Sequence, residues 1–202
     1  MPAIKGKMQE RGVARREAIL DAAVSLMSSR GFRGTALSAV AEEVGLAETS
    51  VLHYFGSKDM LLVAVLRERQ RRDAPDNVAL AAGGGVDALR RFPQLARRIV
   101  ADPSAARLLT VLKAEHLDGE GPIGDWFVRR ARGLRASLAA VLRQGIDRGE
   151  LRADFDVELK AAEIVGFLEG IQIDWLADPS AFDLVAAYES YFGSLVRGLA
   201  AL

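Results

Sequence analysis

The chain has no cysteine and only two histidines among its 202 residues, and these shortages exclude several kinds of chemistry. Without cysteine it has no disulfide framework, no thiolate nucleophile and no thiolate metal site, which fits a reducing cytoplasm. Two histidines leave few candidates for a catalytic base or a metal ligand. We therefore expect no metal, no cofactor and no enzymatic activity.

Long hydrophobic runs are missing as well. No apolar stretch approaches the ~20 residues that a membrane-spanning helix needs. Several lysines and arginines lie near the N-terminus, but Glu17 and Asp21 interrupt the apolar segment that a secretory signal would need after them. Half of the residues are nevertheless hydrophobic, which is enough to bury a core. The sequence thus predicts a soluble cytoplasmic protein without a membrane partner.

Neither sign of charge is in excess, because 27 basic residues balance 27 acidic ones. The balance is uneven along the chain: residues 1–33 contain seven basic and three acidic side chains, a net charge of +4, which leaves −4 for the remainder. Such a basic end is typical of a phosphate-binding surface, but a solvated terminal arm has the same composition. Charge alone does not decide between the two.

Helical periodicity dominates what is present. Apolar residues recur at i, i+3, i+4 and i+7, as in Leu37, Val40, Ala41 and Val44, and glycines, prolines and aspartates separate the periodic segments. No segment has the pattern of a strand. The predicted helices are one around residues 19–27 that ends near Gly31, one over 37–44, one that contains 51–55, and then 58–72, 86–101, 104–117, 123–148, 157–177 and 181–201.

The segment 73–85 breaks this pattern with Pro75 and three consecutive glycines at 83–85. Glycine runs occur in phosphate-binding loops, but no Gly-Lys-Ser/Thr follows this one. We therefore expect a flexible connector between two groups of helices.

Residues 35–55 have the pattern of a helix-turn-helix. Two short helices that cross closely need a small residue at their contact, and Ala41 supplies it. Four residues later the chain must turn sharply, and Gly45 can adopt a left-handed conformation without steric cost. Apolar residues at 40, 44, 46, 51 and 55 would form the small core that fixes the angle between the helices. Short helical hairpins with alanine and glycine also occur in many other proteins, so the pattern alone leaves that alternative open.

Three stretches with their spacing intact resemble the TetR family of transcriptional regulators. They are Gly-Phe-Arg-Gly-Thr at 31–35, Val40-Ala41 with Gly45-Leu46, and His-Tyr-Phe-Gly-Ser-Lys-Asp-Met-Leu at 53–61. The similarity covers residues 14–61, and the remainder matches in length and helical character. The resemblance implies a homodimer that occupies a palindromic operator in double-stranded DNA. It also implies a repressor that a small-molecule effector releases by entering the C-terminal domain.

We accordingly predict an all-α fold of about nine helices in total. An N-terminal three-helix helix-turn-helix domain is joined by a fourth helix to a C-terminal helical bundle. The predicted domains are 1–57, which binds DNA, and 58–202, which binds the ligand and forms the dimer.

The resemblance assigns DNA contacts to positions in and around the motif. Thr35 begins the second helix, where its hydroxyl caps the helix or meets a phosphate. Residues at the start of the recognition helix reach bases, the later aromatic pair touches backbone and base edges, and Lys58 meets a phosphate. The predicted DNA-binding residues are Arg15, Thr35, Glu48, Thr49, Ser50, Leu52, His53, Tyr54 and Lys58. For His53 an ordinary surface position, and for Tyr54 packing against the fourth helix, remain alternatives.

Three positions depart from the family's common pattern. Ala47 replaces a usual serine, which weakens or moves the cap of the recognition helix. Leu52 replaces a frequent tyrosine and offers a methyl contact to thymine in place of a hydroxyl. Glu48 repels phosphate, yet its carboxylate can accept a hydrogen bond from cytosine N4. These differences bear on which DNA sequence is read.

Two apolar stripes mark the last two helices, which in TetR relatives pack against their symmetry mates. The resemblance implies the same arrangement here, and the alternative is that the stripes belong to the core of one chain. The predicted dimer-interface residues are Ile164, Leu168, Ile171, Trp175, Val185, Tyr188, Phe192 and Leu195.

An effector pocket is expected among the middle helices, although aromatic residues at helical spacing also form ordinary cores. His116 beside Glu115 and Asp118 suggests a metal site, but a single histidine without cysteine makes a polar anchor for a ligand the better interpretation. The candidates for the pocket wall are Phe92, Leu112, His116, Trp126, Phe127 and Phe167.

Two other classes of protein remain as alternatives. An all-helical enzyme could use Glu115 and His116, but the chain has no paired nucleophile and base. A helical small-molecule or lipid-binding protein without DNA activity would explain the C-terminal half and would leave residues 35–58 unexplained.

Overall fold

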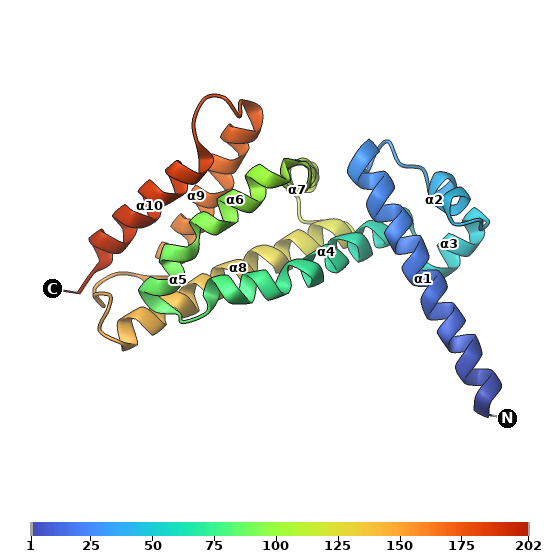
Figure 1. Ribbon diagram of the computed structural model, residues 1–202, viewed down its shortest axis with the longest axis horizontal. Coiled ribbons are helices and arrows are strands. Elements are labelled where there is room, and N and C mark those ends of the chain that lie inside the picture. The colour runs from blue at the N-terminus through green and yellow to red at the C-terminus, as the bar shows by residue number, and fades with distance from the viewer. Residues whose placement is uncertain (1, 202) are drawn as a thin grey trace. The chain divides into compact units, whose positions relative to one another are not determined.

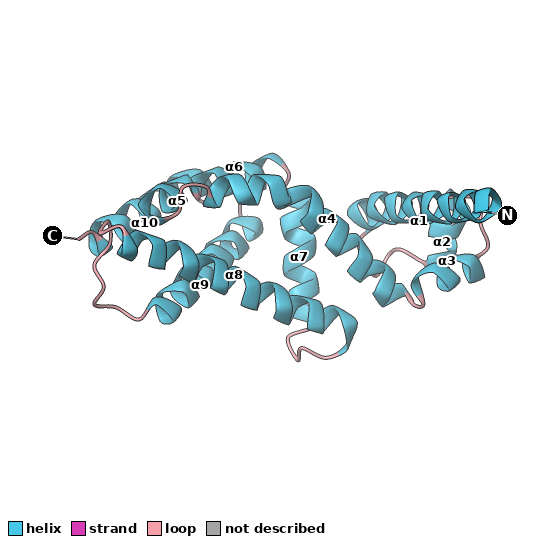
Figure 2. Ribbon diagram, turned by 90° about the horizontal axis from the view of Figure 1, so that it is seen from below, coloured by secondary structure: helices cyan, strands magenta, loops and turns pink. Residues whose placement is uncertain are grey.

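The computed structural model describes residues 2–201, and every regular element in that part of the chain is a helix, as Figures 1 and 2 show. The predicted all-α fold is confirmed. The described residues form ten helices rather than about nine. Their bounds are α1 Pro2–Arg30, α2 Leu37–Glu43, α3 Glu48–Phe55, α4 Lys58–Ala81, α5 Gly85–Arg91, α6 Pro93–Ala101, α7 Pro103–Glu115, α8 Gly121–Asp147, α9 Val157–Ala177 and α10 Leu184–Leu199. None of these ten is both long and apolar enough to cross a membrane.

The chain divides into two compact units. The first contains Met1–Arg72 and Asp118–Trp126, and the second contains Asp73–Leu117 and Phe127–Leu202. The division falls inside α4, whereas the sequence suggested a boundary at residue 57. Leu61, Leu62 and Leu66 account for the difference, because these α4 side chains are buried and hold the first turns of α4 in the N-terminal unit. The division of functions at residue 57 stays a prediction.

In the first unit α2 packs against both α1 and α3 (Figure 1). The predicted apolar face of the first helix is confirmed, since Ile19, Ala23 and Met27 are buried. The helix ends where the Gly31 N–H donates to the Met27 carbonyl at 3.0 Å, with Gly31 at φ +73°. The start of α4 is capped by Ser57, because the Met60 N–H donates to the Ser57 hydroxyl at 3.1 Å.

The expected connector at 73–85 is mostly helix, so that prediction is wrong. Helix α4 passes through Pro75 and ends at Ala81, with Leu80 buried in the second unit. Proline cannot donate the backbone hydrogen bond to the carbonyl four residues earlier. The alanines around it are good helix formers, and Arg98 of α6 donates to the Asp76 carbonyl at 3.2 Å. Only residues 82–84, which contain the glycine turn, lie outside the helices.

The glycine turn packs closely against Glu150. The Glu150 carboxylate accepts the Val86 N–H at 2.9 Å and so caps the start of α5. A Cβ on Gly85 would lie 2.1 Å from this carboxylate, and the φ of Gly85 is +55°. Glycine is therefore required at this position by both space and conformation.

The segment predicted as one helix over 86–101 is two helices, α5 and α6. Pro93 is the first residue of α6, and without an N–H it cannot continue the hydrogen-bond ladder of α5. Phe92 lies at the junction, where its N–H donates to the Leu89 carbonyl at 3.3 Å. The chain thus changes direction at an aromatic residue that faces the core of the second unit.

The core of the second unit lies where α10 packs against α5, α6 and α9 (Figure 1). Its largest side chains include Tyr188 and Phe192 of α10, which are almost completely buried. Phe92 stacks on Phe192 with ring centroids 4.7 Å apart, and Phe167 of α9 meets the same ring edge-on at 6.4 Å. Aromatic side chains from three separate segments therefore hold these helices together.

Candidate nucleic-acid interface

The turn between α2 and α3 has the hydrogen bonds of a glycine-ended helix. The Gly45 N–H donates to the Glu42 carbonyl at 3.0 Å, and the Leu46 N–H donates to the Ala41 carbonyl at 2.8 Å. This pair of bonds is the Schellman motif, in which the residue after the helix takes the left-handed conformation. Gly45 has φ +64°, as predicted from the sequence, and Ala41 is buried at the contact between the helices.

Helix α3 has one buried and one exposed face. Val51 and Phe55 are buried and fix the helix on the rest of the first unit. Glu48, Thr49 and His53 are exposed, and the remaining predicted contacts on this helix, Ser50, Leu52 and Tyr54, are half-buried. The helix thus presents the side chains that were predicted to read DNA on the side away from its own core.

Ala47 is the N-cap of α3 and makes no side-chain hydrogen bond to the helix. Its backbone has φ −77° and ψ 149°, the extended conformation of an N-cap, so the cap has the right backbone shape but no acceptor. The weaker cap predicted from this position is confirmed.

The predicted capping role of Thr35 is wrong. The N-cap of α2 is Ala36, and the Thr35 hydroxyl instead donates to the Gly31 carbonyl at 2.8 Å. Thr35 is 1% exposed, so in this conformation it has almost no surface from which to reach a phosphate. The Thr35 side chain thus closes the loop between α1 and α2. The motif does not predict its hydrogen bond to the Gly31 carbonyl.

Lys58 and Tyr54 each have a partner within the first unit. The Lys58 ammonium lies 4.4 Å from the centroid of the Phe32 ring, a cation–π contact that holds the side chain at the start of α4. Tyr54 lines a groove together with Met60 and Ala64 of α4, which supports the alternative that it packs on that helix. Its ring meets that of His53 edge-on at 6.0 Å. Arg15 is exposed on α1.

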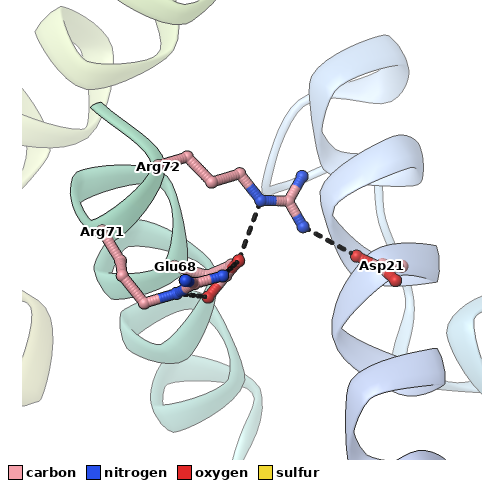
Figure 3. Close-up of polar contacts among 4 residues, drawn as sticks. All are labelled: Asp21, Glu68, Arg71 and Arg72. Carbon is pink, nitrogen blue, oxygen red and sulfur yellow. Dashed lines mark hydrogen bonds and ion pairs between the residues drawn. The ribbon is translucent and has the colours of Figure 1, made fainter. Parts of the chain in front are cut away.

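A network of charged side chains ties α4 to α1, as Figure 3 shows. Glu68 accepts hydrogen bonds from Arg71 at 2.7 and 2.9 Å and from Arg72 at 2.8 Å. Arg72 also donates to Asp21 of α1 at 2.9 Å. The bonds from Arg71 and then Arg72 lower the pKa of Glu68 from 4.5 to about 2. The sequence reasoning missed this network because Asp21 and Arg72 are 51 residues apart.

The residues predicted to line an effector pocket are only partly brought together. Phe92 and Phe167 meet around Phe192, as described above. His116 directly follows α7, and its ring Nδ1 lies 2.8 Å from the Leu112 carbonyl of that helix, so this nitrogen is already engaged. Leu112 and Phe127 are buried, as is Trp126, which belongs to the first unit whereas the other five belong to the second. Among the side chains that the structure describes, no three acidic or histidine residues are grouped to hold a metal ion.

One polar atom in this aromatic cluster lacks a partner. The Tyr188 hydroxyl is buried and has no hydrogen-bond partner among the described residues. Burial raises the pKa of this phenol well above its usual range. Buried polar groups without a partner are rare in folded proteins, so this hydroxyl is a candidate contact for a ligand or a water molecule.

Most of the predicted dimer-interface residues lie in the core of the chain instead. Ile164, Leu168, Trp175, Tyr188 and Phe192 are all buried in the second unit, which favours the alternative that the stripes belong to the core of one chain, and their place at an interface stays a prediction. The other three, Ile171, Val185 and Leu195, are partly buried against the same core. The apolar stripes correspond to packing of α9 and α10 within one chain. Periodicity alone shows that a helix face is covered and does not say which partner covers it.

A different face of α9 is exposed. Leu159 and Ile173 are 59% and 51% exposed, and small residues lie between them on the same side of the helix. A Cβ on Gly166 or Gly170 would have no heavy atom within 4 Å. Spacings of three and four residues place these positions on one stripe. The exposed α9 face, as we call it, consists of Leu159, Ala162, Gly166, Gly170, Ile173 and Ala177. This face does not stand out in the sequence, because glycine and alanine have small side chains that contribute little to a pattern of hydrophobic residues.

An N-terminal helical unit in which a buried alanine and a left-handed glycine join two short helices defines a helix-turn-helix protein. Comparison with protein families agrees. Residues 19–65 match the model described as bacterial regulatory proteins of the tetR family, and residues 85–188 match the tetracyclin repressor-like C-terminal domain. The chain belongs to the TetR family, and it is therefore a DNA-binding transcriptional regulator that responds to a small molecule.

Known proteins resemble both parts of the chain. The fatty acid metabolism regulator protein of Bacillus subtilis (strain 168) is 24% identical over 189 residues, which are 90% of this chain and 93% of that protein. RutR of Escherichia coli (strain K12) is 44% identical over 63 residues, which are 31% of this chain and 30% of RutR. The crystal structure of FadR from Bacillus subtilis in complex with stearoyl-CoA has a TM-score of 0.69 at 21% identity and covers 91% of this chain and 98% of that one. These relatives are regulators and not enzymes.

Proposed function

We propose that the chain is a homodimeric repressor that operates in the cytoplasm, occupies a palindromic operator through α3 and leaves it when an effector binds the second unit. The observation that carries the proposal is the two-faced geometry of α3. Val51 and Phe55 are buried and fix the helix in place, while Glu48, Thr49 and His53 are exposed on its other side. A recognition helix reads the major groove with the side chains of its exposed face.

Operator binding and its salt dependence test the reading surface. Genomic fragments bound by the purified chain would supply the operator, and affinity would be measured by fluorescence anisotropy at several salt concentrations. Binding is expected to weaken steeply with salt, because phosphate contacts release counterions. Thr49→Ala should change the preferred base at one operator position, with a loss of about 1–3 kcal/mol in binding free energy. Lys58→Ala should lower the affinity for all DNA sequences alike and make that affinity less dependent on salt concentration.

The control is Arg107→Gln on α7, which removes an exposed positive charge from the second unit. This variant should bind the operator as the parent chain does. If Thr49→Ala and Glu48→Gln both keep the parent's preference for every operator variant, α3 is not the reading element and the proposal fails.

For the dimer we propose that the exposed α9 face packs on its copy in a second chain. Glycine and alanine at the centre of the face allow two helix backbones to approach closely, and Leu159 and Ile173 at its ends supply apolar area. A symmetric dimer uses the same patch on both chains, so a continuous stripe along one helix suits it. A dimer also matches the two half-sites of a palindrome.

For the effector we propose a largely apolar molecule that carries a hydrogen-bond acceptor for the Tyr188 hydroxyl. The proposal is supported by that unpartnered hydroxyl among the rings of Phe92, Phe167 and Phe192. The first probe is stearoyl-CoA, which a FadR relative binds. Stearoyl-CoA should release the operator from the parent chain and act more weakly on Tyr188→Phe. The same variant should leave the unliganded chain as stable as the parent or more so, because it removes a buried unsatisfied group.

A further inference from the structure

We infer that the groove between α1 and α4 in the first unit is a binding site for a small organic carboxylate with an apolar body. The groove has a volume of about 250 Å³ and lies wholly within the N-terminal unit. Tyr54 of α3 also lines it, but the exposed α3 residues proposed to read the operator, Glu48, Thr49 and His53, and the proposed effector site in the second unit do not. The site is thus additional to the function proposed above.

The floor of the groove is apolar. Leu20 of α1 and Phe55 of α3 lie on it, together with Met60 and Ala64 of α4. Leu20 and Phe55 are buried, while Met60 is 40% exposed. Ligand sites are commonly concave and apolar with a few polar groups at fixed places. An inorganic anion would leave this floor uncovered, whereas an apolar chain or ring would fill it.

The rim of the groove is positively charged. Arg16, Arg67 and Arg71 line it with Glu68 as the one acidic residue among the lining side chains, so the lining carries a net charge of +2. Glu68 does not offset the two other arginines, because Arg71 and Arg72 already occupy both of its oxygens (Figure 3).

Two of these arginines are available to a ligand. Arg67 is exposed and makes no ion pair within the described part of the chain. The Arg16 guanidinium lies 5.0 Å from the centroid of the Phe55 ring and also has no carboxylate partner among the side chains that the structure describes. Guanidinium groups bind carboxylates through paired, charge-assisted hydrogen bonds. A ligand whose carboxylate binds the rim arginines and whose apolar body covers the floor would match both the charge and the apolar surface of the groove.

The Met60 methyl group reports on this groove directly. The chain contains four methionines, and Met27 of α1, which is 1% exposed, is an internal control within the same unit. The experiment is a titration of the full chain, labelled with carbon-13 at the methionine methyls, with octanoate. The Met60 resonance is assigned with Met60→Leu. Octanoate should shift the Met60 methyl signal saturably, while the same concentration of inorganic phosphate should not.

Two variants distinguish the groove from the effector site. Arg67→Gln should raise the octanoate dissociation constant measured at Met60 by about tenfold or more, because a charge-assisted contact is lost. Ala64→Phe should fill the floor and abolish the shift. Arg107→Gln, with the same loss of charge in the second unit, should change nothing at Met60.

Several results would overturn the inference. Absence of a Met60 shift at millimolar octanoate would do so, as would an affinity that Arg67→Gln leaves unchanged. If operator DNA shifts Met60 and octanoate does not, the rim arginines serve DNA phosphates instead. None of these results bears on whether α3 reads the operator, so failure here leaves the proposed function standing.

Discussion

At the scale of single residues, the turn of the helix-turn-helix is where sequence and structure agree most closely. Ala41 and Gly45 were recognisable because their roles depend on neighbours within five residues: a small side chain at a helix contact, and a left-handed backbone after it. Thr35 was misjudged for the opposite reason. Its hydroxyl partner, the Gly31 carbonyl, becomes available only when the loop after α1 folds back.

The uncapped start of α3 leads to a stability prediction. Ala47→Ser is expected to increase the free energy of unfolding by about 1 kcal/mol, because the backbone there already has the extended conformation of an N-cap and a serine oxygen would accept a helix N–H. Urea denaturation followed by circular dichroism measures the change. Ala14→Ser, at an exposed position inside α1, is the control and should lower stability by a few tenths of that amount. A gain no larger at position 47 than at position 14 would contradict the assignment.

The charged network at Glu68 predicts a pH dependence. The pKa of Glu68 is about 2 in the fold and 4.5 ordinarily. The ionised carboxylate therefore contributes stability above about pH 4.5, and this contribution is lost as the pH falls towards 2. The thermal midpoint of Glu68→Gln should thus lie below that of the parent chain at neutral pH, and the two should converge in acid.

The matched control for this comparison is Glu42→Gln, which removes an exposed α2 carboxylate without an arginine partner in the described part of the chain. Midpoints would be measured by differential scanning calorimetry from about pH 7 to about pH 3. A difference between parent and Glu68→Gln that stays constant over this range would show that the network does not stabilise the fold.

At the scale of whole elements, periodicity located most helices and failed at prolines. Pro75 was expected to interrupt the helices and Pro93 was not considered, and the structure differs at both: α4 runs through Pro75, whereas Pro93 divides a segment that was expected to be one helix. A proline removes one hydrogen bond in either case. Whether the helix continues depends on contacts from distant segments, such as that of Arg98 with Asp76, which the local sequence does not contain.

The helices α9 and α10 illustrate a second limit of periodicity. Their apolar stripes were correctly seen, yet Ile164, Tyr188 and Phe192 turn inward to the core of one chain. The exposed α9 face escaped notice because its centre is Gly166 and Gly170. Small residues are favourable where helices approach closely, but they add almost nothing to a hydrophobicity pattern.

This face gives a test of the dimer at the level of one element. Gly170→Arg should shift the chain from dimer to monomer in sedimentation velocity at micromolar concentration, because a long charged side chain would separate the two copies of α9. The fold should persist, since a Cβ at this position meets nothing within 4 Å. Gly133→Arg on α8 is equally uncrowded and should remain dimeric. A dimer that survives Gly170→Arg would place the interface elsewhere.

At the scale of the whole molecule, the family and the all-α fold were predictable from the sequence because the N-terminal motif is specific and local. The division into two compact units within α4 was not, since it depends on which buried leucines of one continuous helix face which core. The identity of the effector also lies beyond the motif. In our proposal it depends on a few side chains, among them Tyr188, whose hydroxyl is buried without a hydrogen-bond partner among the described residues.

The most direct test of the central claim uses the operator and a copy with five base pairs inserted between its half-sites. A dimer that reads two successive major grooves needs recognition helices about 34–36 Å apart, and a half-turn insertion rotates one half-site to the opposite side of the duplex. We predict one dimer per operator, with affinity reduced to the non-specific level by the insertion. Equal affinity for both duplexes, or a single chain bound per site, would contradict the account of this protein as a dimeric helix-turn-helix regulator.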